Sequence, residues 1–331
     1  MSLKVAVIIC TKNRSTDLDI TLHSISFQTL LPDTLLIVDD SNNDATEKIT
    51  KKYSSYLPTN VMYLYPQPMN SGLPAARNFG IKNVPDNADI IVFLDDDVSL
   101  DPPYLEAIQK SFMLSPDVVG VGGFILEGYH NRRWYEKPIL AMIGFLLPTL
   151  VPVSLSGFRL TKTGVALQPI CIDTDKNFRN TEWLSGCNMA YRKSVFSEGN
   201  FFDEHFVRYA FGEDILFSHQ LYKKGGKIII TKLARLHHRI SQEDRLSSKR
   251  NLTMIFGYRK YSLQKFSGSG LAGRFYFRWF TVNFFLSALV LSLIRKNNFS
   301  YLKNTIEAYH DYKLFEKKIE RNDLESFNAL F

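Results

Sequence analysis

Three consecutive aspartates, Asp95, Asp96 and Asp97, directly follow an apolar run, Ile90–Leu94. Adjacent carboxylates repel one another, and charged side chains are unfavourable in the interior of a buried strand. They either lie in a solvated turn or hold a cation between them. Mg²⁺ and Mn²⁺ take oxygen ligands and are often bound by one or two carboxylates plus substrate phosphates. The triplet therefore suggests a metal site, with Asp95 and Asp97 on one side of an extended turn.

A second acidic pair, Glu213 and Asp214, follows Gly212 at the start of a predicted helix over residues 215–223. A carboxylate in a ligand site can accept the proton of an attacking hydroxyl group. The same position also suits an N-cap or first-turn acid that the helix dipole stabilises. We favour catalysis, because a metal site upstream would need a base beside it.

Two further clusters leave alternatives open. His237 and His238 lie beside Arg235 and Arg239, so they either bind a metal or phosphate or form a basic loop. Residues 186–188, Gly-Cys-Asn, either bring the backbone close to a ligand or only open a strand.

The N-terminal third of the chain alternates short apolar runs with helical stretches. The runs of strand length are 5–10, 35–38, 61–65 and 90–94, and the helical stretches are 15–28, 46–53 and 71–81. This alternation predicts βαβ units and a mostly parallel sheet. Ligands of such sheets bind at the carboxyl ends of the strands. We therefore expect Thr11–Arg14, Asp39–Asp40 and the aspartate triplet to meet at one edge, although single strands also end in polar loops without function.

Composition is that of an ordinary globular protein with a mild basic excess. The 331 residues are 45% hydrophobic and 22% charged, with a net charge of +7. That charge suits an anionic substrate or an anionic membrane surface, and no nucleic-acid-binding motif accompanies it. The three cysteines, Cys10, Cys171 and Cys187, show no metal or disulfide spacing, and no signal peptide follows Lys4. We expect a reducing, cytosolic setting.

Two apolar stretches, residues 138–153 and 275–294, need a separate explanation. The first holds three prolines and is shorter than the ~20 residues that a membrane-spanning helix needs. The second is long enough, but Arg278 interrupts it and basic residues flank it. Each is either a buried core helix or a surface that lies in a membrane interface with cationic anchors. A span over 279–294 is the less favoured interpretation, and the tail, 301–331, is expected to form amphipathic helices.

Six segments, in order, resemble the motifs of the family-2 inverting glycosyltransferases. They are VAVIICTKNR, LLIVDDSNND, NSGLPAARNFGI, IIVFLDDDV, WLSGCNMAYRKSVF and FGEDILFSHQLYKKGGKI, and together they span about residues 3–240. The resemblance implies an α/β protein with the GT-A fold, which is a Rossmann-like, mixed and mainly parallel sheet flanked by helices. A C-terminal helical extension is expected to follow it.

The resemblance also implies a domain organisation. Residues 1–240 would form the GT-A glycosyltransferase domain, with the nucleotide-sugar half in 1–100. The acceptor half would occupy 101–240 and contain an insertion at 128–180. Residues 241–331 would form a helical, membrane-associating region.

Carried over residue by residue, the resemblance assigns roles at the strand ends. The nucleotide would be contacted by Thr11, Asn13, Arg14, Asp40, Arg77, Asp95 and Asp96. Mn²⁺ or Mg²⁺ would be held by Asp97 and Asp95 together with His238 or His237. Asp214 would be the catalytic base beside Glu213, and the donor and acceptor sugars would lie against Trp183, Gly186, Cys187 and Asn188. The additional Asp96 leaves the assignment within the triplet open.

The function implied is a metal-dependent, inverting glycosyltransferase of hexosyltransferase type. It would move one sugar from a nucleotide-diphospho-sugar to a hydroxyl of a lipid-linked glycan in surface-polysaccharide biosynthesis. The processive members of the family carry a QxxRW motif, whose nearest match here is Phe275–Trp279 with Phe in the Gln position. We therefore expect single-sugar addition by a cytoplasmic enzyme that is peripheral on the inner face of the cell membrane.

Two alternatives from other functional classes stay open. A sugar-phosphate nucleotidyltransferase would normally carry a GxGTRxxP-like loop after its first strand, where this chain has TKNRSTDL (11–18). A non-catalytic nucleotide-sugar-binding membrane module would not need both the metal site and Asp214.

Overall fold

The computed structural model describes most of the 331 residues, and these form two compact units. The described residues are 2–66, 72–128, 136–154, 157–169, 176–208, 210–239, 241, 248–268, 270–294 and 299–331. Unit 1 comprises Met1–His130, Asp173–Glu204 and Glu213–Asp244. Unit 2 comprises Asn131–Ile172, His205–Gly212 and Arg245–Phe331.

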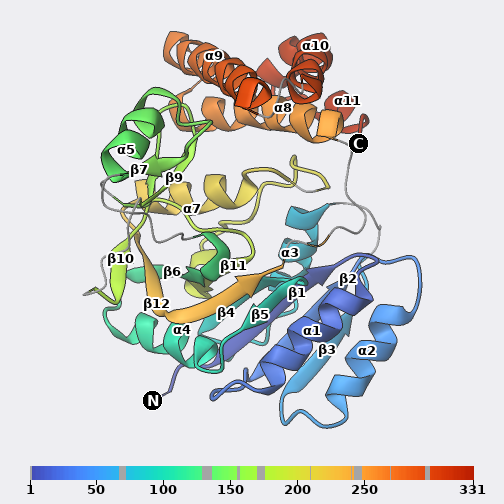
Figure 1. The fold of residues 1–331 in the computed structure, drawn as a ribbon. Coiled ribbons are helices and arrows are strands. Elements are labelled where there is room, and N and C mark those ends of the chain that lie inside the picture. Colours follow the sequence, from blue (N-terminus) through green and yellow to red (C-terminus); the bar gives the residue numbers. More distant parts are fainter. Residues whose placement is uncertain are drawn as a thin grey trace. The chain divides into compact units, whose positions relative to one another are not determined.

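Unit 1 is built on a nine-stranded mixed sheet (Figure 1), in the order β10-β12-β6-β11-β4-β1-β2-β3, with β5 paired to β12. The strands are β1 (Val5–Thr11), β2 (Thr34–Asp39), β3 (Asn60–Leu64), β4 (Ile90–Asp95), β5 (Val98–Leu100), β6 (Val118–Ile125), β10 (Phe178–Asn180), β11 (Asn188–Arg192) and β12 (Lys227–His238). Strands β3, β2, β1 and β4 are parallel, as are β6 and β12, whereas β11 runs antiparallel between them. The predicted α/β class with a mixed sheet is confirmed.

Helices cover both faces of this sheet. They are α1 (Ser15–Ser26), α2 (Ala45–Ser54), α3 (Leu73–Lys82), α4 (Tyr104–Met113), the short α6 (Ser194–Ser197) and α7 (Glu213–Lys223), with a 3₁₀ turn η1 at Leu126–Gly128. In Figure 1, α1, α2 and α4 lie on one face, and α3 and α7 on the other. Burial on both faces explains why the parallel strands are continuous apolar runs rather than alternating ones.

The two faces of the sheet have different cores. On one face, aliphatic side chains such as Val7 and Ile9 pack with Leu22 of α1 and Ile108 of α4. On the other face, aromatic rings contact one another mostly edge to face, and these are Phe93, Tyr191, Phe196, Phe202 and Phe217. A rigid, close-packed sheet is therefore available to hold residues at its edges.

The carboxyl ends of β1, β2 and β4 lie side by side. Thr11 at the end of β1 is in register with Asp39 of β2, and Cys10 is in register with Asp95 of β4. The expectation that the three polar clusters meet at one edge of the sheet is therefore confirmed.

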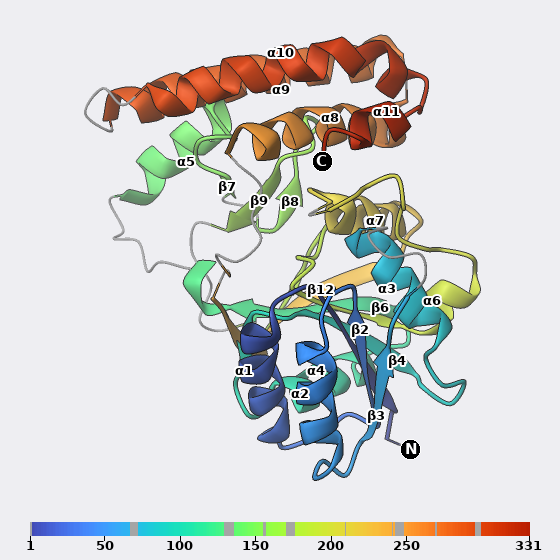
Figure 2. The same ribbon diagram turned by 90° about the vertical axis from the view of Figure 1, so that its right-hand side faces the viewer.

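Unit 2 combines the middle of the chain with the C-terminal helices (Figure 2). Its elements are α5 (Glu136–Leu146), β7 (Val153–Ser154), β8 (Arg159–Leu160), β9 (Ala166–Pro169), α8 (Ser248–Ser267), α9 (Leu271–Ile294), α10 (Ser300–Glu320) and α11 (Glu325–Asn328). Strands β7, β9 and β8 form a small sheet. The hydroxyls of Thr149 and Ser287 are 2.7 Å apart, and Arg259 donates to the carbonyl of Gly164. The middle segment is thereby tied to α8 and α9.

The C-terminal helical extension is confirmed. The described part of the expected insertion at 128–180 that lies in unit 2, residues 136–154 and 157–169, packs with the C-terminal helices. The division into domains 1–240 and 241–331 stays a prediction.

Candidate functional site

The middle aspartate of the triplet is directed into the protein. The hydroxyl of Thr11 donates to Asp96 Oδ2 at 2.7 Å, and Arg14 Nη1 lies 3.5 Å from Asp96 Oδ1. Burial raises the pKa of Asp96 to about 7, against the opposing effects of Arg14 and Thr11. Two of the residues expected at the nucleotide, Thr11 and Arg14, are therefore connected to the triplet by this carboxyl group.

The third aspartate is bound to the end of β12. His238 Nε2 lies 3.1 Å from Asp97 Oδ1, and the backbone N–H of Ser241 donates to Asp97 Oδ2 at 2.7 Å. Burial would raise the pKa of Asp97, but the hydrogen bonds from His238 and Ser241 outweigh it and lower the pKa to about 2. The structure thus brings together two residues that are far apart in the sequence, Asp97 and His238.

The side chains around His238 fit a divalent cation. Ligand atoms of Asp95, Cys187 and His238 all lie within 4.8 Å of one another. Carboxylates suit Mg²⁺ and Mn²⁺, and imidazole joins them at transition-metal sites. The 3.1 Å between His238 and Asp97 is close to the ~3 Å between neighbouring octahedral ligands with bonds of ~2.1 Å. Asp97, which is bound to His238, lies next to this group and could add a further carboxylate ligand.

The neighbouring histidine has a different partner. His237 Nδ1 lies 2.6 Å from Glu127 Oε1, and Glu127 Oε2 accepts the backbone N–H of His238 at 3.0 Å. Glu127 was not predicted, because its position in the turn after β6 carries no sequence signal of its own. It holds the end of β12 where His238 meets the triplet, and of the two histidines only His238 joins the group of ligand atoms.

Arg77 of α3 lies at the centre of a buried charge cluster. It pairs with Glu213, and its Nη2 lies 3.4 Å from Asp95 Oδ1 and 3.0 Å from the carbonyl oxygen of Gly186. Its side chain is only 3% exposed. Arg77 was expected at the nucleotide; in the structure it connects the triplet, α7 and the loop before β11.

Asp214 is held at the N-terminal turn of α7. Its Oδ2 accepts the backbone N–H of Gly186 at 2.6 Å, and its Oδ1 accepts that of Ile215 at 2.8 Å. Burial raises the pKa of Asp214, while Arg77 and these hydrogen bonds oppose the shift. The helix begins at Glu213 rather than at residue 215, so both acids lie in its first turn.

Gly186 allows this cluster to close. A Cβ at this position would lie 3.0 Å from Arg77 Nη2 and 3.2 Å from Asp214 Oδ2. Both are tighter than ordinary van der Waals contact. The close approach expected of this glycine is observed toward two protein side chains, and its approach to a sugar stays a prediction.

The ends of β1 and β2 are bound to each other. Lys12 Nζ lies 3.0 Å from Asp40 Oδ2, and the backbone N–H of Asn13 donates to the hydroxyl of Ser41 at 2.7 Å. Asp39, which was expected at this edge beside Asp40, is buried and accepts the hydroxyl of Tyr63 at 2.8 Å. These bonds fix the edge at which Asn13 and Asp40 were expected to meet the nucleotide.

The residues expected at the sugars are mostly internal. Asn188 Oδ1 accepts the backbone N–H of Gly123 at 2.9 Å and also the hydroxyl of Tyr104. Trp183 and Cys187 are buried as well. The structure therefore brings Gly186 and Cys187 to the charge cluster and directs the Asn188 side chain into the core.

Comparison with known proteins adds to this geometry. A profile of the family described as "Glycosyl transferase family 2" matches residues 6–199. The chain is 25% identical, over 72% of its length and 70% of the relative's, to the "Glucosyl-dolichyl phosphate glucuronosyltransferase" of Haloferax volcanii. It is 23% identical, over 71% of its length and 66% of the relative's, to the "O-antigen chain rhamnosyltransferase RfbN" of Salmonella typhimurium.

A solved structure shares the architecture. This is the mannosyltransferase PcManGT from Pyrobaculum calidifontis, solved in complex with GDP-Man and Mn²⁺. The likeness has a TM-score of 0.59 at 13% identity and covers 94% of this chain and 87% of that one. At this identity the likeness concerns the fold alone, and it confirms the predicted GT-A fold.

Proposed function

Because the chain belongs to glycosyl transferase family 2, we propose that unit 1 transfers one sugar from a nucleotide-diphospho-sugar to an acceptor hydroxyl group, with inversion. The observation that carries this proposal is the meeting of two groups of side chains. Asp95 and His238 belong to a group of possible cation ligands, and Asp97 is bound to His238. Arg77 joins Asp95 to the peptide of Gly186, whose N–H binds Asp214.

The cation ligands would bind the diphosphate of the sugar donor through the metal ion. Asp95, Asp97 and His238 would hold Mn²⁺ or Mg²⁺, and such an ion neutralises the charge that develops on a departing diphosphate. Asp96, Thr11, Arg14, Asn13 and Asp40 lie along the same strand ends and would border the nucleoside. Residues that also bond to one another, such as Thr11 with Asp96, present the nucleoside with a rigid edge.

Asp214 would act on the hydroxyl group of the acceptor. A hydroxyl group that attacks the donor sugar must lose a proton, and a carboxylate within hydrogen-bond reach can take it. The two backbone N–H groups fix both oxygens of Asp214 but leave lone pairs on each. Glu213 is buried and pairs through Oε1 with the buried Arg77, whereas Asp214 is partly exposed. We therefore assign the base to Asp214 and a positioning role to Glu213.

The acceptor we propose is a lipid-linked glycan in surface-polysaccharide synthesis. The names of the two curated relatives include a dolichyl phosphate and an O-antigen chain. An acceptor that is anchored in a bilayer requires the enzyme to work at a membrane surface. We place the protein at the cytoplasmic face, as a peripheral enzyme.

Calorimetric titration with UDP, GDP, dTDP and CDP, with and without Mn²⁺, tests the donor site. We expect one nucleotide to bind in a metal-dependent manner. The Asp97→Ala variant should lose at least about tenfold in that affinity, since even residues that only support a metal ligand contribute this much. Asp86→Ala is the matched control, because Asp86 lies in unit 1 and its side chain is fully exposed.

The outcomes separate the alternatives. Binding that needs no metal, or that Asp97→Ala leaves intact, would remove Asp97 from the metal site. If none of the four nucleotides binds under any condition, the transferase proposal fails. Binding without transfer to any acceptor would favour the non-catalytic binding module.

A further inference from the structure

Unit 2 exposes a continuous apolar stripe along its longest helix, α9. The stripe, called here the α9 stripe, consists of Leu271, Phe275, Trp279, Val282, Leu286, Leu289 and Leu293, which are 39–80% exposed. Their spacing of three and four residues places them on one side of the helix. A helix of 24 residues is ~36 Å long. Contiguous apolar surface of this extent marks an interaction site rather than chance exposure.

The opposite side of α9 is built into unit 2. The ring of Phe277 contacts that of Tyr312 in α10, and the ring of Phe280 contacts that of Phe256 in α8. The hydroxyl of Ser287 bonds to Thr149. α9 is long and apolar enough to cross a membrane, but a crossing helix would have to give up these contacts. The packing therefore favours a helix that lies flat with the α9 stripe outward.

The charge of unit 2 indicates which kind of partner binds the α9 stripe. Unit 2 contains 21 of the 40 lysines and arginines but only 7 of the 33 aspartates and glutamates, so its formal net charge is +14 and that of unit 1 is −7. α9 has no acidic residue, and its two cations, Arg274 and Arg278, are exposed. A second copy of unit 2 would bring like charges together, whereas anionic lipid headgroups would neutralise them.

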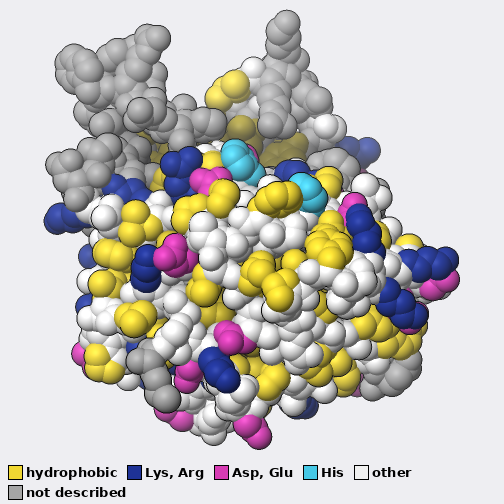
Figure 3. Space-filling view, turned by 90° about the horizontal axis from the view of Figure 1, so that it is seen from below, with side chains coloured by type: hydrophobic (Ala, Val, Ile, Leu, Met, Phe, Trp, Pro, Cys, Tyr) yellow, Lys and Arg dark blue, Asp and Glu magenta, His cyan; other side chains and the backbone are white. Residues whose placement is uncertain are grey.

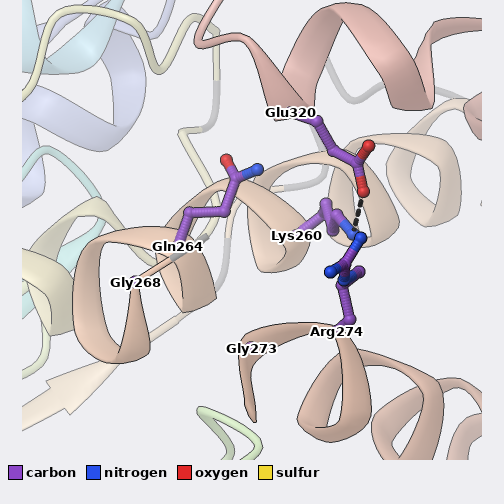
Figure 4. A pocket seen from close by; sticks show the side chains of 6 residues that line it. All are labelled: Lys260, Gln264, Gly268, Gly273, Arg274 and Glu320. Atoms are coloured by element: carbon purple, nitrogen blue, oxygen red, sulfur yellow. Dashed lines mark ion pairs between the residues drawn. The ribbon is translucent and has the colours of Figure 1, made fainter. Parts of the chain in front are cut away.

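A group of polar and charged side chains lies at the beginning of the stripe. A cavity of about 180 Å³ is lined by Lys260, Gln264, Gly268, Gly273, Arg274 and Glu320 (Figure 4). Lys260 is buried and pairs with Glu320 at 2.7 Å, and Arg274 points toward that pair. Lys260 also lies 4.0 Å from Glu316, so its charge is balanced within unit 2. Arg274 is the exposed cation at this end of the stripe.

We propose that unit 2 docks on the surface of an anionic bilayer through the α9 stripe, with α9 in the plane of the interface. The apolar side chains would enter the boundary between headgroups and acyl chains, and the arginines would stay at the phosphates. Trp279 suits this depth, since Trp is enriched at membrane interfaces. The inference concerns unit 2 alone and does not depend on the reaction proposed for unit 1.

Vesicle binding tests the proposal directly. The purified full chain is sedimented with vesicles of phosphatidylcholine alone or mixed with phosphatidylglycerol, at low and high salt. We expect binding to the anionic vesicles that weakens as salt rises. The double variant Leu286→Glu/Leu289→Glu should bind more than about tenfold more weakly, because each buried leucine contributes at least that factor. Both side chains are exposed, so folding in water should be retained.

The matched control is Met113→Glu/Leu114→Glu. These side chains at the end of α4 are as exposed as those of the stripe, but they belong to unit 1. Figure 3 shows one face of the molecule, on which apolar side chains lie among charged side chains of both signs. The control should bind vesicles like the wild type. Equal loss in both variants would overturn the assignment of the docking face.

Two other results would overturn the proposal. The first is that the wild-type chain binds neither kind of vesicle but forms a dimer, as measured by light scattering. The Leu286→Glu/Leu289→Glu variant would then be monomeric. A second copy would then cover the stripe.

The second result concerns the depth of Trp279 in the bilayer. It is measured by quenching of the Trp279 fluorescence with lipids brominated near the headgroup or near the chain end. In-plane docking predicts that the label near the headgroup quenches more strongly than the label near the chain end. This quenching should be lost in Trp279→Phe. Stronger quenching by the label near the chain end would indicate a spanning helix.

Discussion

At the scale of residues, three neighbouring carboxyl groups have three different environments. Asp95 pairs with Arg77. Asp96 is buried and bonds to Thr11 and Arg14. Asp97 bonds to His238 and to the backbone of Ser241. Each partner comes from a different strand end or helix. The chemistry open to each aspartate is therefore set by which element reaches it.

Replacement of Asp214 by Asn tests the proposed base. Asn keeps the shape, but it cannot take a proton, and its single oxygen can replace only one of the two acceptors that bind the N–H groups of Gly186 and Ile215. We expect kcat to fall by ~10²–10⁴-fold, while metal-dependent nucleotide binding stays within a factor of about two. Turnover equal to that of the wild type would remove Asp214 from catalysis.

The pH profile of kcat checks the same assignment independently. Burial raises the pKa of Asp214 above the ordinary carboxyl value of 3.8. A base works when deprotonated, so turnover should be complete above this raised pKa and should be lost as the pH falls through it. Measured at saturating donor and metal, the acid limb should lie above pH 3.8 and should be absent from the residual rate of Asp214→Asn.

At the scale of elements, close helix–sheet packing sets the position of the site. Arg77 reaches the cluster because α3 lies close to β1, where Gly80 faces Ile8. A Cβ at residue 80 would lie 2.8 Å from Ile8 Cγ2, which real side chains essentially never do. The helix therefore depends on this glycine for its distance from the sheet.

Gly80→Ala should accordingly destabilise the protein. Overpacking of a close-packed interior costs ~1–3 kcal/mol, and the better helix propensity of Ala returns at most about 1 kcal/mol of that. The free energy of unfolding from urea titration measures the balance. Gly270→Ala is the control, since its Cβ would meet open space. A stability change no larger than in that control would show that α3 is free to shift.

At the scale of the whole molecule, charge differs between the two units, for which we propose different tasks. The carboxylates that could bind a cation lie in unit 1, whose net charge is −7, and the excess of lysine and arginine lies in unit 2. The overall charge of +7 hides this asymmetry. An acidic unit concentrates metal ions, and a basic unit is attracted to anionic surfaces.

The two tasks should separate in variants. Leu286→Glu/Leu289→Glu should leave metal-dependent nucleotide affinity within about twofold of the wild type, because the two sites are built from residues of different units. Asp97→Ala should leave binding to anionic vesicles within the same range. Calorimetry and vesicle sedimentation on both variants measure the four values. Loss of both activities in either variant would mean that the two units do not act independently.

Much of the fold follows from local pattern. Strands β1, β2, β3 and β4 lie within a residue or two of their predicted bounds, because apolar runs bounded by polar turns are read without tertiary information. The order of six motifs was enough to predict the family. Helix starts lie equally close to their predicted positions. α1 begins at the expected Ser15, and α7 begins two residues before the expected position, since two acids suit a first turn as well as a cap.

By itself, the sequence determined which residue types follow each strand, and hence that carboxylates would gather at one edge of a sheet. Only the tertiary structure decided their partners: Arg77 with Glu213, His238 rather than His237 beside Asp97, Asn188 in the core, and one side of α9 exposed. The physical reason is range. Secondary structure depends on residues a few positions apart, whereas a hydrogen bond or an ion pair joins side chains that only the packing of distant elements brings within 3 to 4 Å.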